Sequence, residues 1–154
     1  MSELTEIERL PRRTEVARMP RAVPAEPGLF TVDATWGTIQ PQHLPGGVET
    51  VAELEVIEHI RAGGAVVDCR QPEYVRHGTL PGAIAIPHQE IVERLAGPGP
   101  IVLFCNGPQC SATPQAVAAL LDAGWDPSRL RYYRGGIHDW VTLGLPLGGA
   151  VDDR

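Results

Sequence analysis

The sequence predicts an α/β fold, a mostly parallel five-stranded sheet with helices on both faces. Two observations carry this prediction. Short apolar runs typical of buried strands alternate along the chain with amphipathic stretches typical of helices. Residues 101–104 are the most apolar of these runs, which indicates a central strand buried on both faces. In such a sheet the active site is expected at the carboxyl ends of the strands.

The first predicted helix follows residue 50. Thr50 is expected to cap it and Glu53 to complete a capping box, and Gly63–Gly64 ends it. Its buried face is predicted to consist of Val51, Leu54, Ile57 and Ile60. After it, strands are predicted at residues 65–69, 83–86, 101–104 and 130–133, and helices at residues 70–77, 89–96, 111–123 and 137–143.

The two ends of the chain differ from this regular pattern. Residues 1–34 hold many prolines and arginines and few large apolar side chains, which predicts a flexible or surface-draped arm. A single domain is expected at residues 35–148, followed by a C-terminal tail at residues 149–154. The chain of 154 residues is long enough for one such domain with its own core.

Composition argues against several classes of partner and site. The net charge of -6 argues against nucleic-acid binding. No apolar run reaches the roughly 18 residues of a membrane span, and the N-terminus lacks an apolar signal-peptide core, so we expect a cytoplasmic protein without a membrane partner. Three cysteines are an odd and sparse set, which argues against a disulfide scaffold. The five histidines lack metal-ligand spacing, so neither a metal nor another cofactor is expected.

Cys105 is the candidate nucleophile. It ends the apolar run at residues 101–104 and precedes a tight loop, before a helix that begins near Ser111. Inward-pointing loop amides and a helix N-terminus favour negative charge, so we expect the pKa of the Cys105 thiol to be lowered. Gly107 allows the chain to turn here, and Pro108 stiffens the turn.

Four ordered motifs resemble those of the rhodaneses, the thiosulfate and persulfide sulfurtransferases. Phe104–Cys105 with its six-residue loop is similar to the rhodanese active-site loop. Three further motifs are similar to rhodanese signatures: Asp68–Cys69–Arg70 with Glu73–Tyr74, the run GTLPGAIAIP at residues 78–87, and residues 134–146, which begin RGGI. The resemblance covers about residues 48–148.

This resemblance implies sulfur transfer without a metal or organic cofactor. The Cys105 thiolate would attack the outer sulfur of thiosulfate or of a persulfide, and the resulting Cys105 persulfide would pass its sulfur to a thiol acceptor or to cyanide. The loop would hold the negative charge of the sulfur. Its residues expected to bind substrate are Asn106, Gly107, Pro108, Gln109, Cys110 and Ser111. The implied partners are a small sulfur-donor anion or a persulfide-carrying protein, and a thiol acceptor.

The loop itself departs from the rhodanese pattern. Many rhodaneses carry a basic residue in or closing this loop, whereas Asn106, Gln109 and Cys110 are neutral. The departure favours a less charged or protein-bound persulfide donor, and Arg134 is a candidate to supply the missing charge. Thr79 stands where the family has histidine, a change expected to cost only a local hydrogen bond. Related phosphatases bind phosphate through an arginine in the corresponding loop. Because this loop contains no arginine, phosphatase activity is not expected.

Alternatives stay open for the cysteines. Cys110 could resolve an oxidised Cys105 as a disulfide, or it could simply cap the loop. Rhodanese-like folds also serve as non-catalytic or redox-sensing interaction modules, in which Cys105 and Cys110 would report oxidation. Cys69, in contrast, is expected to fill core space.

Overall fold

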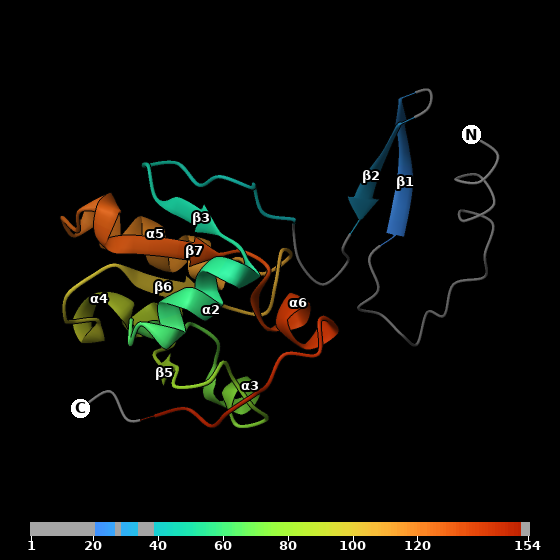
Figure 1. Cartoon of the computed structure of the whole chain (residues 1–154). Helices are drawn as coiled ribbons and strands as arrows, with labels where there is room; N and C mark the ends of the chain where they lie inside the picture. The colour runs from blue at the N-terminus through green and yellow to red at the C-terminus, as the bar shows by residue number, and fades with distance from the viewer. Residues whose placement is uncertain (1–20, 27–28, 34–38, 152–154) are drawn as a thin grey trace. The chain divides into compact units, whose positions relative to one another are not determined.

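The computed structural model describes residues 21–26, 29–33 and 39–151, so most of the expected flexible arm lies outside the described residues. The chain divides into two compact units, residues 1–39 and 40–154. In the first unit, β1 (Arg21–Glu26) and β2 (Leu29–Asp33) pair as an antiparallel hairpin (Figure 1). The sequence pattern predicted no strand there, because the prolines around it are typical of irregular chain.

The second unit contains a five-stranded parallel sheet with the strand order β3-β7-β6-β4-β5. The strands are β3 (Glu49–Val51), β4 (Val66–Asp68), β5 (Ile84–Ala85), β6 (Ile101–Phe104) and β7 (Leu130–Tyr133). The helices are α2 (Glu53–Arg61), α3 (Pro72–Val75), α4 (Ile91–Arg94), α5 (Ala112–Asp122) and α6 (Gly136–Thr142), with 3-10 turns η1 (His88–Glu90) and η2 (Pro127–Arg129). The predicted fold class is confirmed (Figure 1).

Helices cover both faces of this sheet, as the contacts of two consecutive residues of β6 show. Leu103 belongs to a core cluster with Val117 of α5 and Ile91 of α4. Phe104 belongs to a second cluster with Trp140 of α6 and with side chains of α2. A strand that is apolar at every position is what two covered faces require. Cys105 follows this strand and belongs to the first cluster, on the face covered by α4 and α5.

The start of α2 differs from the prediction. Thr50 lies in β3, and its hydroxyl donates a hydrogen bond to the carbonyl of Gln42 at 2.7 Å. Glu55 instead accepts a hydrogen bond of 3.1 Å from the backbone N–H of Ala52, the residue before the helix. The predicted capping box at Thr50 is therefore wrong, because that residue extends the sheet beside β7.

The buried face of α2 also differs from the prediction. Leu54 was expected to point inward but is 78% exposed, whereas Val56 is fully buried. These two residues are about 200° apart around a helix, so only one of them can face the sheet. Ile57 and Ile60 do pack, in part, against the core cluster that contains Val56.

The end of the described chain borders β5. Gly148 and Thr79 exchange two backbone hydrogen bonds of 2.9 Å, and the N–H of Val151 donates to the carbonyl of Ala83 at 2.9 Å. These contacts cover backbone groups at the sheet edge that would otherwise be unpaired. Within the described part of the chain, no helix has the length and apolarity needed to cross a membrane.

Candidate active site

Cys105 lies at the carboxyl end of β6, the middle strand of the sheet. The residue is 2% exposed. Its Sγ accepts a hydrogen bond of 3.5 Å from the backbone N–H of Thr113 and lies 3.6 Å from the carbonyl oxygen of Cys110, to which it donates. Thr113 belongs to the first turn of α5, so the partial positive charge of this helix N-terminus acts on the sulfur.

The first turn of α6 holds the loop that follows Cys105. The backbone N–H groups of Ile137 and His138 donate to the carbonyls of Cys105 and Asn106 at 3.1 and 2.8 Å. Gly136, at the start of α6, has a φ of 61°, and a Cβ at this position would collide with the carbonyl oxygen of Cys105. The missing side chain therefore lets α6 approach the loop closely.

Replacing Gly136 by alanine is expected to destabilise the protein and distort the loop. The methyl group would lie 2.8 Å from the nitrogen of Gly107 and 2.9 Å from the carbonyl carbon of Asn106. The left-handed conformation and this crowding together should lower the free energy of unfolding by about 2–4 kcal/mol. Urea denaturation measures the loss.

Gly63 provides the matched control for that substitution. It has a φ of 80°, but a Cβ there would meet no atom within 4 Å. Gly63→Ala therefore reports the conformational cost alone, about 1–2 kcal/mol. Equal losses in the two variants would contradict the close approach of α6 to the loop.

Fewer backbone N–H groups of the loop are available to bind an anion than the length of the loop suggests. The N–H of Cys110 closes a turn on the carbonyl of Gly107 at 3.0 Å, and Pro108 has no N–H. Gln109 is buried at 7% exposure, and Ser111 is the N-cap residue of α5. The structure gathers these predicted substrate-binding residues in one loop around Cys105, while their contact with a substrate stays a prediction.

Arg134 reaches this loop through a backbone segment. Its Nε and Nη2 donate to the carbonyl of Gln40 at 3.0 and 2.7 Å, and the N–H of Gln40 donates to the carbonyl of Pro108 at 2.7 Å. The guanidinium thus supports the chain that lies against the loop. Binding of a donor anion by Arg134 stays a prediction. Nothing in the sequence signalled Gln40, because it acts through backbone atoms.

The pKa values of the two loop cysteines are shifted in opposite directions. Burial, and next the neighbouring Cys110, raise the pKa of the Cys105 thiol well above its ordinary value. A hydrogen bond from Cys105 lowers the pKa of Cys110 to about 6, helped by backbone N–H groups of Ala112 and Asn106 and by the charge of Arg70. The expected lowering of the Cys105 pKa is therefore wrong for the resting protein. Cys110, the less buried of the two residues, has the lower pKa.

A buried ionic network lies at the end of β4, the strand next to β6. Asp68 is fully buried, and it accepts hydrogen bonds from the Nη2 of Arg70 at 2.8 Å and from the hydroxyl of Thr79 at 2.7 Å. Arg70 also donates to the carbonyl of Gly78 at 2.8 Å. Thr79 thus makes a local hydrogen bond at the position where the sequence departs from the rhodanese pattern. Nothing in the sequence indicated the effect of Arg70 on the pKa of Cys110.

Cys69 fills core space, as predicted. It is 0% exposed and packs in the same cluster as Cys105. Burial raises the pKa of its thiol to about 12, so it carries no charge at neutral pH. Among the described residues, no three His, Cys, Asp or Glu side chains gather closely enough to hold a metal ion.

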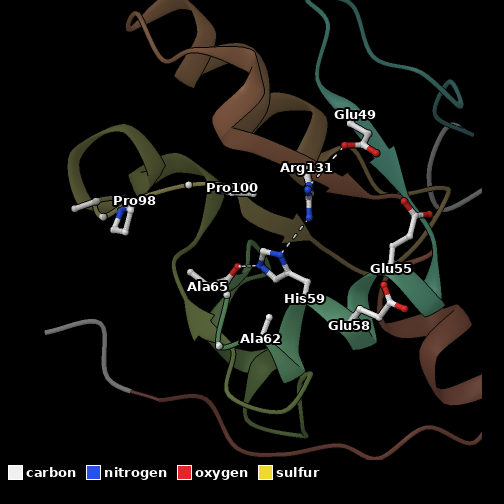
Figure 2. Close-up of a pocket in the computed structure, with 14 residues that line it drawn as sticks. Glu49, Glu55, Glu58, His59, Ala62, Ala65, Pro98, Pro100 and Arg131 are labelled. Carbon is white, nitrogen blue, oxygen red and sulfur yellow. Dashed lines mark hydrogen bonds and ion pairs between the residues drawn. The ribbon is translucent and has the colours of Figure 1, made fainter.

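A cavity of about 810 Å³ lies at the opposite, amino end of the strands, next to the residues that precede β4 and β6 (Figure 2). Its His59 lies 2.7 Å from the carbonyl oxygen of Ala65 through Nε2 and 3.5 Å from Arg131 through Nδ1. Arg131 in turn pairs with Glu49 at 3.6 Å. These groups partner one another and the lining contains no cysteine, so this cavity is separate from the site around Cys105.

A family model for the rhodanese-like domain matches residues 53–143. The chain belongs to the rhodanese-like domain family. This rhodanese-like chain is 26% identical to the BH2092 protein of Bacillus halodurans, with a TM-score of 0.57 over 67% of this chain and 77% of that one. It is 25% identical to the thiosulfate sulfurtransferase of Pseudomonas aeruginosa, with a TM-score of 0.57 over 68% of this chain and 21% of that one.

A curated relative has a different description. The HTH-type transcriptional regulator Rv0324 of Mycobacterium tuberculosis (strain ATCC 25618 / H37Rv) is 36% identical over 103 residues, which are 64% of this chain and 44% of that protein. The rhodanese-like chain therefore spans less than half the length of this relative. Family membership establishes the fold, and the activity has to be argued from the site.

Proposed function

We propose that this rhodanese-like domain is a sulfurtransferase that carries sulfur as a persulfide on Cys105. The position of Cys105 carries the proposal. Its sulfur lies at the end of the middle strand, with the N–H of Thr113 at 3.5 Å and the N-terminus of α5 directed at it. Partial positive charge of this kind stabilises an anionic sulfur bonded to Cys105. The likeness to a structure named as a thiosulfate sulfurtransferase supports the proposal.

The transfer proceeds in two half-reactions. In the first, the Cys105 thiolate attacks the outer sulfur of thiosulfate, a new S–S bond forms, and sulfite leaves with the electron pair of the broken bond. With an organic persulfide as donor, the leaving group is the corresponding thiolate. In the second, an acceptor thiolate or cyanide attacks the outer sulfur of the persulfide, and the Cys105 thiolate is regenerated.

Cys110 serves as the proton acceptor in the first half-reaction. The pKa of Cys105 is raised and that of Cys110 is lowered, so Cys110 is the more readily ionised of the two. In the resting structure the Cys105 thiol donates to the carbonyl oxygen of Cys110 at 3.6 Å, and transfer of this proton to the Cys110 sulfur produces the Cys105 thiolate that attacks the donor. A partner with a pKa of about 6 is ionised at neutral pH and is therefore ready to accept that proton.

Arginines of an adjacent groove supply the positive charge that the loop lacks. Arg70, Arg76 and Arg94 line a groove of about 320 Å³ together with Glu90. Because Asp68 pairs with Arg70 and Glu90 pairs with Arg94, the three arginines and two carboxylates leave one net positive charge. The effect of the Arg70 charge on the pKa of Cys110 supports a role of this groove near the loop. Guanidinium groups bind carboxylate and sulfonate oxygens, so an anionic donor, small or protein-borne, fits this arrangement.

Steady-state turnover tests the proposed function. We expect thiocyanate from thiosulfate and cyanide, or transfer from a small organic persulfide to a thiol. Varying both substrates should give the parallel double-reciprocal lines of a ping-pong reaction. Absence of turnover with both donors would contradict the proposal.

The proton-acceptor role predicts a pH effect of Cys110→Ser. Wild-type protein should keep one loop thiolate down to about pH 6, because the pKa of Cys110 is lowered, and lose it below that pH. In the variant, Cys105 is the remaining loop thiol, and burial raises its pKa. Its thiolate then appears only above its ordinary range, so sulfur loading at pH 7 should fall at least about 10-fold and recover as the pH rises.

Thiolate absorbance and stopped-flow loading, measured from about pH 5 to about pH 9, check this prediction. Cys69→Ala is the matched control, because Cys69 is fully buried and its pKa is raised to about 12. The control should keep the wild-type profile. A Cys110→Ser variant with the wild-type profile would show that Cys110 takes no proton from Cys105.

Redox sensing is a second candidate function, favoured by the second loop cysteine with its lowered pKa and by the regulator among the relatives. Hydrogen peroxide would oxidise the Cys110 thiolate to a sulfenic acid with release of hydroxide. Attack by the Cys105 thiol would then form a disulfide and release water. A peroxide-dependent Cys105–Cys110 disulfide in protein that shows no sulfur turnover would favour the sensor over the enzyme.

A further inference from the structure

The hydroxyl of Tyr132 is a buried polar group without a hydrogen-bond partner. Tyr132 is 1% exposed, and its Oη makes no hydrogen bond within the described residues. Native proteins pair nearly all buried polar atoms, so each exception needs an explanation. The next residue, Tyr133, shows the usual arrangement, since its hydroxyl donates to Glu53 at 2.9 Å.

Strand register places Tyr132 on the Cys105 side of the sheet. Tyr132 of β7 pairs with Leu103 of β6, and both belong to the core cluster that contains Cys105. Cys105, the residue after β6, is the next position along the chain that belongs to this cluster. From the rise and spacing of strands, its Cα lies roughly 8 Å from that of Tyr132. Diagonal neighbours at this separation are within reach of an aromatic side chain.

The surroundings of the hydroxyl agree with this placement. Burial raises the pKa of Tyr132, and Cys105 and Cys110 raise it further while Arg134 lowers it. The two loop cysteines thus influence the ionisation of this phenol. Because the hydroxyl stays protonated, it can donate a hydrogen bond. In the resting protein, however, the Cys105 Sγ is engaged by Thr113 and by the carbonyl of Cys110.

We propose that the hydroxyl of Tyr132 donates a hydrogen bond to the outer sulfur of the Cys105 persulfide, an inference that rests on the proposed sulfur transfer. The outer sulfur extends about 2 Å beyond Sγ and brings an acceptor that the resting thiol lacks. The hydroxyl is thus unpaired before sulfur loading and paired after it. An interaction made only with the intermediate stabilises that intermediate without stabilising the resting protein.

Tyr132→Phe tests this inference, with Tyr133→Phe as the matched control on the opposite face of the same strand. Each variant is equilibrated with thiosulfate and increasing sulfite, and the loaded fraction is read by intact-protein mass spectrometry. A hydrogen bond to a charged acceptor predicts that the equilibrium constant for loading falls about 10- to 100-fold in Tyr132→Phe. It should be unchanged in Tyr133→Phe.

Unfolding of the sulfur-free proteins separates this role from a structural one. Removing an unpaired hydroxyl should leave the thermal midpoint of Tyr132→Phe unchanged or raised, whereas Tyr133→Phe loses its bond to Glu53 and should melt lower. Unchanged loading in Tyr132→Phe, with wild-type protein that loads sulfur, would overturn this inference alone. Wild-type protein that takes no sulfur would overturn the proposed function, and the role of Tyr132 with it.

Discussion

Replacing Cys105 by serine is expected to lower sulfur transfer at least about 10³-fold while leaving the fold intact. A serine hydroxyl is not ionised at neutral pH and cannot form a persulfide. It is close in size to the thiol, so the N–H of Thr113, which lies 3.5 Å from Sγ, keeps an acceptor. Thiocyanate formation measures the activity, and the thermal midpoint verifies that the variant is folded.

Companion variants of the other two cysteines make this result decisive. Cys69→Ala should keep its activity because Cys69 is fully buried in the core. Cys110→Ser should keep the reaction but show the changed pH dependence. Activity that survives Cys105→Ser and disappears in Cys110→Ser would assign the nucleophile to Cys110, the cysteine with the lower pKa.

Replacing Asp68 by alanine is expected to cost about 3–5 kcal/mol of unfolding free energy, because the variant leaves a buried guanidinium without its counter-ion. Asp68 is 0% exposed and Arg70 is 7% exposed. The Nε and Nη2 of Arg70 both donate to this carboxylate, at 3.0 and 2.8 Å, and the hydroxyl of Thr79 donates to it at 2.7 Å. Urea denaturation measures the loss, with Asp68→Asn as a milder variant should alanine prevent folding.

The ion pair of Glu90 and Arg94 is the matched control for that measurement. It has a separation of 3.1 Å on one helical turn, but its side chains are 49% and 34% exposed. An exposed pair of this kind contributes less than about 1 kcal/mol, so Glu90→Ala should change stability little. A loss in Asp68→Ala no larger than in Glu90→Ala would contradict a structural role for the buried network.

The strands and helices that could be predicted are those with a local signal. The apolar run of β6 and the amphipathic α5 are fixed by their own residues, and both were found within a residue or two. β3 was missed because its three residues acquire their structure from pairing with β7, far along the chain. At Thr50 the local signal and the tertiary structure disagree. Its side chain is typical of a helix cap, but the residue lies in β3.

The same distinction holds for the site. The position of Cys105 between a strand and a helix follows from local pattern. The lowered pKa of Cys110 depends first on its hydrogen bond with Cys105, and the raised pKa of Cys105 depends first on burial. Both are properties of the folded protein. The roles of Tyr132 and Arg70 depend on which strands are neighbours in the sheet. Neither role is readable before strand order is known.

Intact-protein mass spectrometry after incubation with thiosulfate, or with a small organic persulfide, shows directly whether Cys105 carries sulfur as a persulfide. We expect a gain of one sulfur atom in wild-type protein and in Cys110→Ser, measured at a pH high enough to ionise Cys105, and no gain in Cys105→Ser. Loss of the added sulfur on addition of cyanide should accompany it. No sulfur adduct with either donor, in protein whose Cys105 thiol is reduced, would contradict the sulfurtransferase assignment and favour the redox module.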